Sequence, residues 1–232
     1  MSLRRLLTVF FLFMLVIAVA GNTCAATLVG KPADTRLDAI VSRIQQHYQA
    51  TQTLSADFDE QLTGISGVKR VRSGHVDYGK PGKFRWEFSE PEKETIVSDG
   101  KLLYDYQPDL DQVLEMPLEQ AFRSAAPVAF LLGFGDLKRD YDTTLLPAAH
   151  TSTAQLLTVA LVPKAGGDRL ELGLEPHSYD LRTVKVTDAI GNVTIISFTH
   201  VVRNAPLKDG LFSFQIPEGA DVIQAPQAPA RP

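Results

Sequence analysis

The pattern of hydrophobic and polar residues predicts a helix near the start of the chain and strands after it. Between residues 34 and 50 the apolar residues recur every three or four positions, at Leu37, Ile40, Val41, Ile44 and Tyr48. This spacing places them on one face of an amphipathic helix. From residue 54 the period becomes two, because Leu54, Ala56 and Phe58 alternate with polar residues. The alternation predicts a half-buried strand and the start of a β-meander.

Turn signals divide the next part of the chain into short strands. The separators are 79–82, Glu90-Pro91, Asp99-Gly100 and Pro108-Asp109. They delimit predicted strands at 68–78, 83–88, 95–98, 102–106 and 112–116. At Asp99-Gly100 we predict a type I′ hairpin turn, in which both central residues have a positive φ.

The alternation stops between residues 118 and 138, where we predict two short helices, the second beginning at Pro127. The strand pattern returns at 141–145, 155–162, 169–174, 181–187, 193–202 and 211–214. The chain is therefore expected to be mainly β, with about ten or eleven strands and three helices. Short strands without intervening helices favour an antiparallel sheet curled into a barrel or half-barrel. Three helices are too few to cover both faces, so we expect them to plug or cover one opening.

The first residues have the pattern of a secretory signal. Arg4 and Arg5 precede an apolar run at 6–20 that is short for a transmembrane span. Cys24 and Ala26 supply the small residues that favour cleavage after Ala26. We therefore predict a signal peptide at 1–26, one domain at 27–224 and a disordered Pro/Ala-rich tail at 225–232. The mature protein is expected in the periplasm.

The single cysteine raises the question of lipid modification. A lipidated N-terminal Cys needs a branched apolar residue three positions before it, whereas this chain has Gly21 there. We therefore expect Cys24 to leave with the signal peptide and the mature protein to contain no disulfide.

Charge narrows the range of partners. The whole chain has a formal charge of −4. Removal of Arg4 and Arg5 would bring the charge near −6, which favours solubility and disfavours nucleic acid or an anionic bilayer surface as a partner. Apolar or basic partners fit this charge better, and we expect a monomer.

No group of residues has the spacing of a catalytic or metal site. The five histidines, at 47, 75, 150, 177 and 200, are scattered singly along the sequence. Phosphate-binding loops, nucleophile motifs and dinucleotide fingerprints are absent from the sequence. An enzyme is the least favoured class, and we expect no cofactor and no metal.

Apolar residues on the strands are the main functional signal. Phe84, Trp86 and Phe88 share one face of a predicted strand, and charged or polar residues share the other. Such residues are often ordinary core. The alternative is the lining of a cavity for an apolar ligand between a curved sheet and short helices. The other residues that could extend this lining are Leu102, Tyr104, Tyr106, Val113, Val193 and Ile195.

Several motifs resemble the outer-membrane lipoprotein carriers of the LolA family. In order along the chain they are Ser55-Ala56-Asp57-Phe58 with Gln61, Gly79-Lys80-Pro81-Gly82-Lys83-Phe84-Arg85-Trp86-Glu87, Val97-Ser98-Asp99-Gly100-Lys101, Tyr104-Asp105-Tyr106-Gln107-Pro108 and Gln112-Val113. The specific match covers about sixty residues.

The resemblance implies an incomplete β-barrel with a helical lid over a hydrophobic cavity. It implies a periplasmic chaperone that takes the acyl chains of lipoproteins from an inner-membrane ABC transporter and delivers them to an outer-membrane receptor. Phe84 would lie near the cavity mouth. Lys80 occupies a basic position that is often an Arg tying the barrel to the lid, and Lys would form a weaker latch than the planar guanidinium.

Other functions share this expected fold. A LolB-type receptor would be anchored through a lipidated Cys, which the residues before Cys24 disfavour. A sensor or chaperone domain would bind peptide or lipopolysaccharide without transport, and a carrier could serve a glycolipid or another acyl compound.

Overall fold

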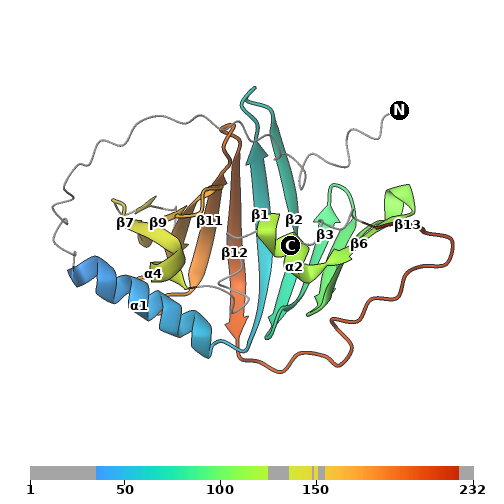
Figure 1. Cartoon of the computed structure of the whole chain (residues 1–232), viewed down its shortest axis with the longest axis horizontal. Helices are drawn as coiled ribbons and strands as arrows, with labels where there is room; N and C mark the ends of the chain where they lie inside the picture. The colour runs from blue at the N-terminus through green and yellow to red at the C-terminus, as the bar shows by residue number, and fades with distance from the viewer. Residues whose placement is uncertain (1–34, 125–135, 148, 151–154, 225–232) are drawn as a thin grey trace, which may run out of the picture. The chain divides into compact units, whose positions relative to one another are not determined.

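The computed structural model describes residues 35–124, 136–147, 149–150 and 155–224, which form a few helices and one large open sheet (Figure 1). The helices are α1 (Thr35–Ala50), α2 (Leu118–Ser124), α4 (Leu137–Asp140) and the 3₁₀ turn η1 (Pro108–Leu110). The strands are β1 (Thr53–Thr63), β2 (Lys69–Gly79), β3 (Lys83–Glu90), β4 (Glu94–Asp99), β5 (Leu102–Gln107), β6 (Gln112–Pro117), β7 (Tyr141–Leu145), β8 (Ala149–His150), β9 (Gln155–Pro163), β10 (Arg169–Leu174), β11 (Leu181–Thr187), β12 (Val193–Arg203) and β13 (Asp221–Gln224). No helix in these ranges is long and apolar enough to cross a membrane.

The sheet consists of two meanders joined at its centre. Its order is β13-β6-β5-β4-β3-β2-β1-β12-β11-β10-β9-β7, and β8 pairs with β9 outside this path. The first long strand, β1, pairs with β12, so that Phe58 lies opposite Phe198. The end strands β13 and β7 do not pair with each other, and the sheet stays open. The predicted mainly β fold with an incomplete antiparallel barrel is confirmed.

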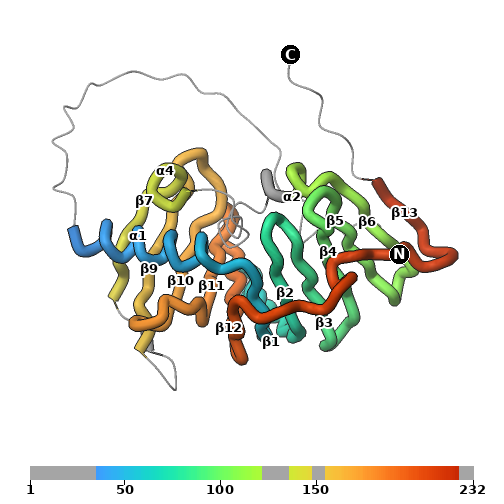
Figure 2. Tube along the Cα trace, turned by 90° about the horizontal axis from the view of Figure 1, so that it is seen from below, coloured from blue at the N-terminus to red at the C-terminus, as the bar shows by residue number. Residues whose placement is uncertain are grey.

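Helix α1 covers one face of the β7–β12 half of the sheet, as both views show (Figures 1 and 2). Its buried residues are Ile40, Val41, Ile44 and Tyr48, four of the five that the helical spacing predicts. They belong to the same core cluster as Leu170, Leu172 and Phe58 of the sheet. We call this the inner face of the sheet and the opposite one the outer face.

The chain after β12 does not form the strand predicted at 211–214. Residues 204–220 cross the sheet to β13 as an irregular segment (Figure 2). The Phe214 side chain of this segment packs against Tyr104 and Tyr106 on the outer face. Phe214 stacks on Tyr104 with ring centroids 5.2 Å apart. The apolar residues that suggested a strand bury side chains instead of pairing backbone groups. The short strand β13, which was not predicted, pairs in parallel with β6.

The predicted second helix beginning at Pro127, the signal peptide and the C-terminal tail lie outside the described residues.

Candidate functional site

An aromatic cluster occupies the inner face at the centre of the sheet. Phe58 of β1 lies against Trp86 and Phe88 of β3, with ring centroids 4.6 and 5.1 Å apart. The Trp86 indole donates a hydrogen bond to the Tyr78 hydroxyl at 3.1 Å. Phe198 of β12 contacts the other side of Trp86, with centroids 6.3 Å apart. Burial of these rings supplies much of the hydrophobic stabilisation of this part of the sheet.

Gly74 of β2 makes this packing possible. It is paired with both Phe58 and Phe88. A Cβ atom at this position would lie 1.9 Å from the Glu87 carbonyl oxygen and 3.0 Å from the Phe58 ring. Any side chain here would push β2 and β3 apart, so glycine is required by close approach and not by turn geometry.

Phe84, Trp86 and Phe88 share the inner face, as their alternation predicts. Phe84 and Phe88 are only 7% and 5% exposed, and Trp86 is partly buried. All three therefore lie within the core in this conformation. Their role in binding a ligand stays a proposal.

The prediction that Leu102, Tyr104 and Val113 extend the same lining is wrong. Phe84 pairs with Ser98, which pairs with Leu103, and Leu103 pairs with Met116. Directly paired residues point to the same face, so Leu103 and Met116 continue the inner face, and their sequence neighbours point outward.

Tyr106, Val193 and Ile195 also lie on the outer face. Val193 and Ile195 pair with Thr63 and Gln61, which alternate with Phe58 along β1. Tyr106 contacts Phe214 of the C-terminal segment, with centroids 5.9 Å apart. All three residues are partly buried, and they do not line the inner face.

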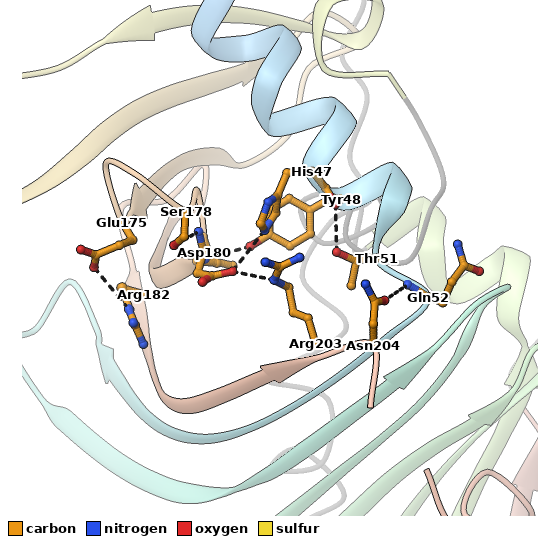
Figure 3. Close-up of polar contacts among 11 residues, drawn as sticks. His47, Tyr48, Thr51, Gln52, Glu175, Ser178, Asp180, Arg182, Arg203 and Asn204 are labelled. Carbon is orange, nitrogen blue, oxygen red and sulfur yellow. Dashed lines mark hydrogen bonds and ion pairs between the residues drawn. The ribbon is translucent and has the colours of Figure 1, made fainter. Parts of the chain in front are cut away.

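The C-terminal turn of α1 is fastened to the sheet by polar contacts (Figure 3). Asp180, just before β11, accepts a hydrogen bond from Arg203 at 2.6 Å and contacts His47 Nε2 at 3.2 Å. The Tyr48 hydroxyl accepts a hydrogen bond from the Leu181 amide at 2.8 Å. Two side chains of the last turn of α1, His47 and Tyr48, thus hold it against the start of β11, and Arg203 of β12 holds Asp180 in place.

Charge and burial shift the titration of these groups. Burial, with the nearby Arg203 charge, lowers the pKa of His47. Burial alone would raise the pKa of Asp180, but the hydrogen bond from Ser178 and the Arg203 charge together lower it. A neutral His47 beside an ionised Asp180 that binds Arg203 is therefore the favoured arrangement near neutral pH.

Lys80 fastens the other side of the same helix end. Its ammonium group donates hydrogen bonds to the backbone carbonyls of Tyr48 and Gln49, the latter at 2.9 Å. Both carbonyls belong to the last turn of the helix, where a cation is also favoured by the helix dipole. Burial lowers the pKa of Lys80.

A small pocket lies between the end of α1 and the inner face. Its lining residues are Tyr48, Thr51, Gln52, Thr53, Leu54, Ala56, Tyr78, Gly79, Lys80, Leu181, Phe198 and Val201. Its cavity volume is about 20 Å³, enough for about one water molecule. An acyl chain does not fit in this pocket.

A charged cluster interrupts the apolar inner face at the opposite ends of β1 and β2. Arg72 binds Glu60 at 2.8 Å and Glu94 at 2.6 Å, and its guanidinium lies 3.9 Å from the centre of the Phe88 ring. Asp105 lies beside Glu94, and its Oδ1 atom is buried without a hydrogen-bond partner. Burial and the Glu94 charge raise the pKa of Asp105 to about 7. This carboxyl group can therefore carry a proton and donate a hydrogen bond to Glu94.

Two histidines that are far apart in sequence contact the same carboxylate, Asp57, on the outer face. Asp57 Oδ1 lies 2.7 Å from His75 Nδ1, and Asp57 Oδ2 lies 2.9 Å from His200 Nδ1. These hydrogen bonds lower the pKa of Asp57. Among the described residues no group of three or more His, Cys, Asp or Glu is arranged to hold a metal ion.

Comparisons with known proteins agree with the geometry. A family model described as "Outer membrane lipoprotein carrier protein LolA" matches residues 49–215. A protein of Methylobacillus flagellatus named outer-membrane lipoprotein carrier protein is 32% identical over 197 residues, 83% of this chain and 92% of that protein. A protein of the same name from Chromobacterium violaceum is 33% identical over 204 residues, 87% of this chain and 95% of that protein.

The fold is also similar to a solved structure. An uncharacterized conserved protein from Thermus thermophilus superposes with a TM-score of 0.54 over 81% of this chain and 98% of that protein. At 14% sequence identity, this similarity concerns the fold alone.

Proposed function

Since this chain belongs to the LolA family of outer membrane lipoprotein carrier proteins, we propose that it is a periplasmic carrier that shelters lipoprotein acyl chains between two membranes. It binds without catalysis. The cargo is released to it by an inner-membrane ABC transporter and passes from it to an outer-membrane receptor.

The observation that carries the proposal is the apolar inner face of the sheet, next to the fastened end of α1. Phe84, Trp86 and Phe88 form a continuous aromatic surface with Phe58. Aromatic and aliphatic surfaces of this kind are suited to acyl chains, because burial of each methylene is worth about 0.8 kcal/mol.

Loading requires a change of conformation. The pocket at the end of α1 holds about 20 Å³, so acyl chains must displace packed side chains. We place the opening at the contact between α1 and the sheet, where Lys80 and the Tyr48 hydroxyl bind. Each such hydrogen bond contributes about 1 kcal/mol net, so a few buried methylenes are enough to offset their loss. In this proposal α1 acts as the lid and Lys80 as its latch.

The direct test is lipoprotein release. The mature protein is incubated with spheroplasts of its host, and the supernatant is assayed for lipoproteins bound to it. Soluble stoichiometric complexes are expected. If no complex forms although free fatty acids shift the emission of Trp86, the only tryptophan, the protein carries or senses another lipid and the proposal fails.

A further inference from the structure

The three most exposed large hydrophobic side chains of the described residues, and a fourth exposed one, lie at one end of the sheet. Ile65, Val68 and Val71 of the β1–β2 hairpin are 72%, 67% and 59% exposed, and Ile190 in the turn between β11 and β12 is 46% exposed. We call these four residues the apolar tip. None of them takes part in the core cluster, so their exposure has no explanation in the packing of the fold.

The two turns that carry the apolar tip touch each other. The backbone amide of Ile65 donates a hydrogen bond to the Asn192 side chain at 3.2 Å. A Cβ atom on Gly191 would lie 3.5 Å from a methyl group of Ile65. Within the first turn, the Gly64 amide donates to the Val68 carbonyl at 2.9 Å. The apolar tip is therefore a built surface formed by two hydrogen-bonded turns.

Two basic residues flank the apolar side chains. Lys69 and Arg70 follow Val68 directly and are exposed, and within the described chain neither forms an ion pair. The nearby Asp188 carboxylate keeps its negative charge but accepts its hydrogen bonds from its own turn, from the Asn192 side chain at 2.7 Å and the Ile190 amide at 3.0 Å. Lys69 and Arg70 thus place two cations beside the apolar tip that no carboxylate of the described residues pairs, although the net charge of the chain is −4.

We propose that the apolar tip, with Lys69 and Arg70, docks on the surface of a bilayer that contains anionic phospholipids. Exposed aliphatic side chains next to free cations are the combination that binds the interface of such a bilayer. Four side chains on one hairpin and one turn are too small a surface for a stable protein–protein interface, which buries about 1,200 Å² or more. The contact is weak and reversible.

Vesicle flotation of the mature protein tests this docking. Vesicles of phosphatidylcholine with phosphatidylglycerol are compared with vesicles of phosphatidylcholine alone. The double variant Ile65→Ser/Val68→Ser and the double variant Lys69→Gln/Arg70→Gln should each lower the fraction bound to anionic vesicles at least about fivefold. The control Val162→Ser/Val202→Ser removes two side chains that are 44% and 50% exposed elsewhere and should bind like the parent protein.

The outcomes separate this inference from the carrier function. The shift in Trp86 emission on binding fatty acids should be the same in all variants, because the apolar tip does not line the inner face. Absence of vesicle binding, equal binding to both vesicle types, or unchanged binding by the tip variants would each overturn the docking proposal while leaving the carrier proposal standing. Capture of a protein partner through the tip without vesicle binding would also overturn it.

Discussion

The ammonium group of Lys80 lies 2.9 Å from the backbone carbonyl of Gln49. This hydrogen bond joins the turn between β2 and β3 to the last turn of α1. It does what a helix C-cap does, but the donor comes from a distant part of the chain. The strength of this single contact therefore bears on how readily α1 separates from the sheet.

Replacement of Lys80 by Met should loosen α1. The change keeps the aliphatic stem but removes the donor to the Tyr48 and Gln49 carbonyls, and we expect a loss of about 1 to 2 kcal/mol in the free energy of unfolding. Hydrogen exchange of the α1 amides should accelerate, and fatty acids should bind faster in stopped-flow measurements of Trp86 emission. Lys83→Met, at an exposed position after the same turn, is the control. Equal effects of the two changes would refute the latch.

The Tyr48 hydroxyl makes a second, separable contribution. Tyr48→Phe leaves the ring in the core but deprives the buried Leu181 amide of its acceptor. We expect the free energy of unfolding to fall by about 1 to 3 kcal/mol, because a buried donor is left unpaired. Urea denaturation measures this change. The control is Tyr106→Phe on the outer face, which should change the free energy of unfolding by less than about 0.5 kcal/mol. A loss of similar size in both variants would show that the hydrogen bond to Leu181 is not responsible.

A charge on the inner face should prevent acyl binding. Phe84→Glu places a carboxylate where the native ring is 7% exposed, and we expect at least about a tenfold loss of fatty-acid affinity. Because this variant is also expected to be less stable, Phe84→Leu provides a folded comparison with a smaller loss. Ser89→Glu adds the same charge to the exposed opposite face of β3 and should bind normally. Normal binding by a folded Phe84→Glu protein would exclude this face as the acyl site.

The raised pKa of Asp105 predicts a dependence of stability on pH. Its pKa is about 7 in the folded protein against an ordinary value of 3.8. The folded protein therefore binds more protons than the unfolded chain between roughly pH 4 and 7, and stability should fall as pH rises through this range. Between these pH values the free energy of unfolding of Asp105→Asn should decrease by up to about 4 kcal/mol less than that of the parent protein. Thermal unfolding at several pH values checks it, with Asp59→Asn on the outer face as control. A parallel pH profile of the parent and Asp105→Asn would contradict the assignment.

The alternation of residues along single strands could be predicted from the sequence, but the faces of neighbouring strands could not. Phe84, Trp86 and Phe88 share the inner face as predicted. In β5 the residues Leu102, Leu103 and Tyr104 are all apolar, so the period does not indicate which of them points inward. The register across the turn at Gly100 decides it. The outer face also buries apolar residues, since Tyr104 and Tyr106 pack against Phe214, and Val113, which pairs with Tyr106, is fully buried although it lies outside the core cluster.

Local turn chemistry was also only partly predictable. The Asp-Gly pair does mark the β4–β5 hairpin, but the prediction of a type I′ turn is wrong. A type I′ turn needs a positive φ at both residues, and only Gly100 has one, at +98°. The Asp99 carboxylate instead accepts hydrogen bonds from the amides of Lys101 and Leu102 at 2.7 and 2.9 Å. Neither the Arg72 cluster nor the shared contact of His75 and His200 with Asp57 has any signal in the sequence, since each depends on pairing between strands.

The pairing of β1 with β12 at the centre of the sheet constrains the order in which the protein can fold. Each meander consists of hairpins between neighbouring segments, which form quickly because their contacts are local. The two central strands are joined only after nearly the whole chain has been synthesised, since Phe58 meets Phe198. Until then both halves present an unpaired edge, which is a site for misassociation with other chains. Pairing of β1 with β12 thus completes the sheet and at the same time removes both unpaired edges.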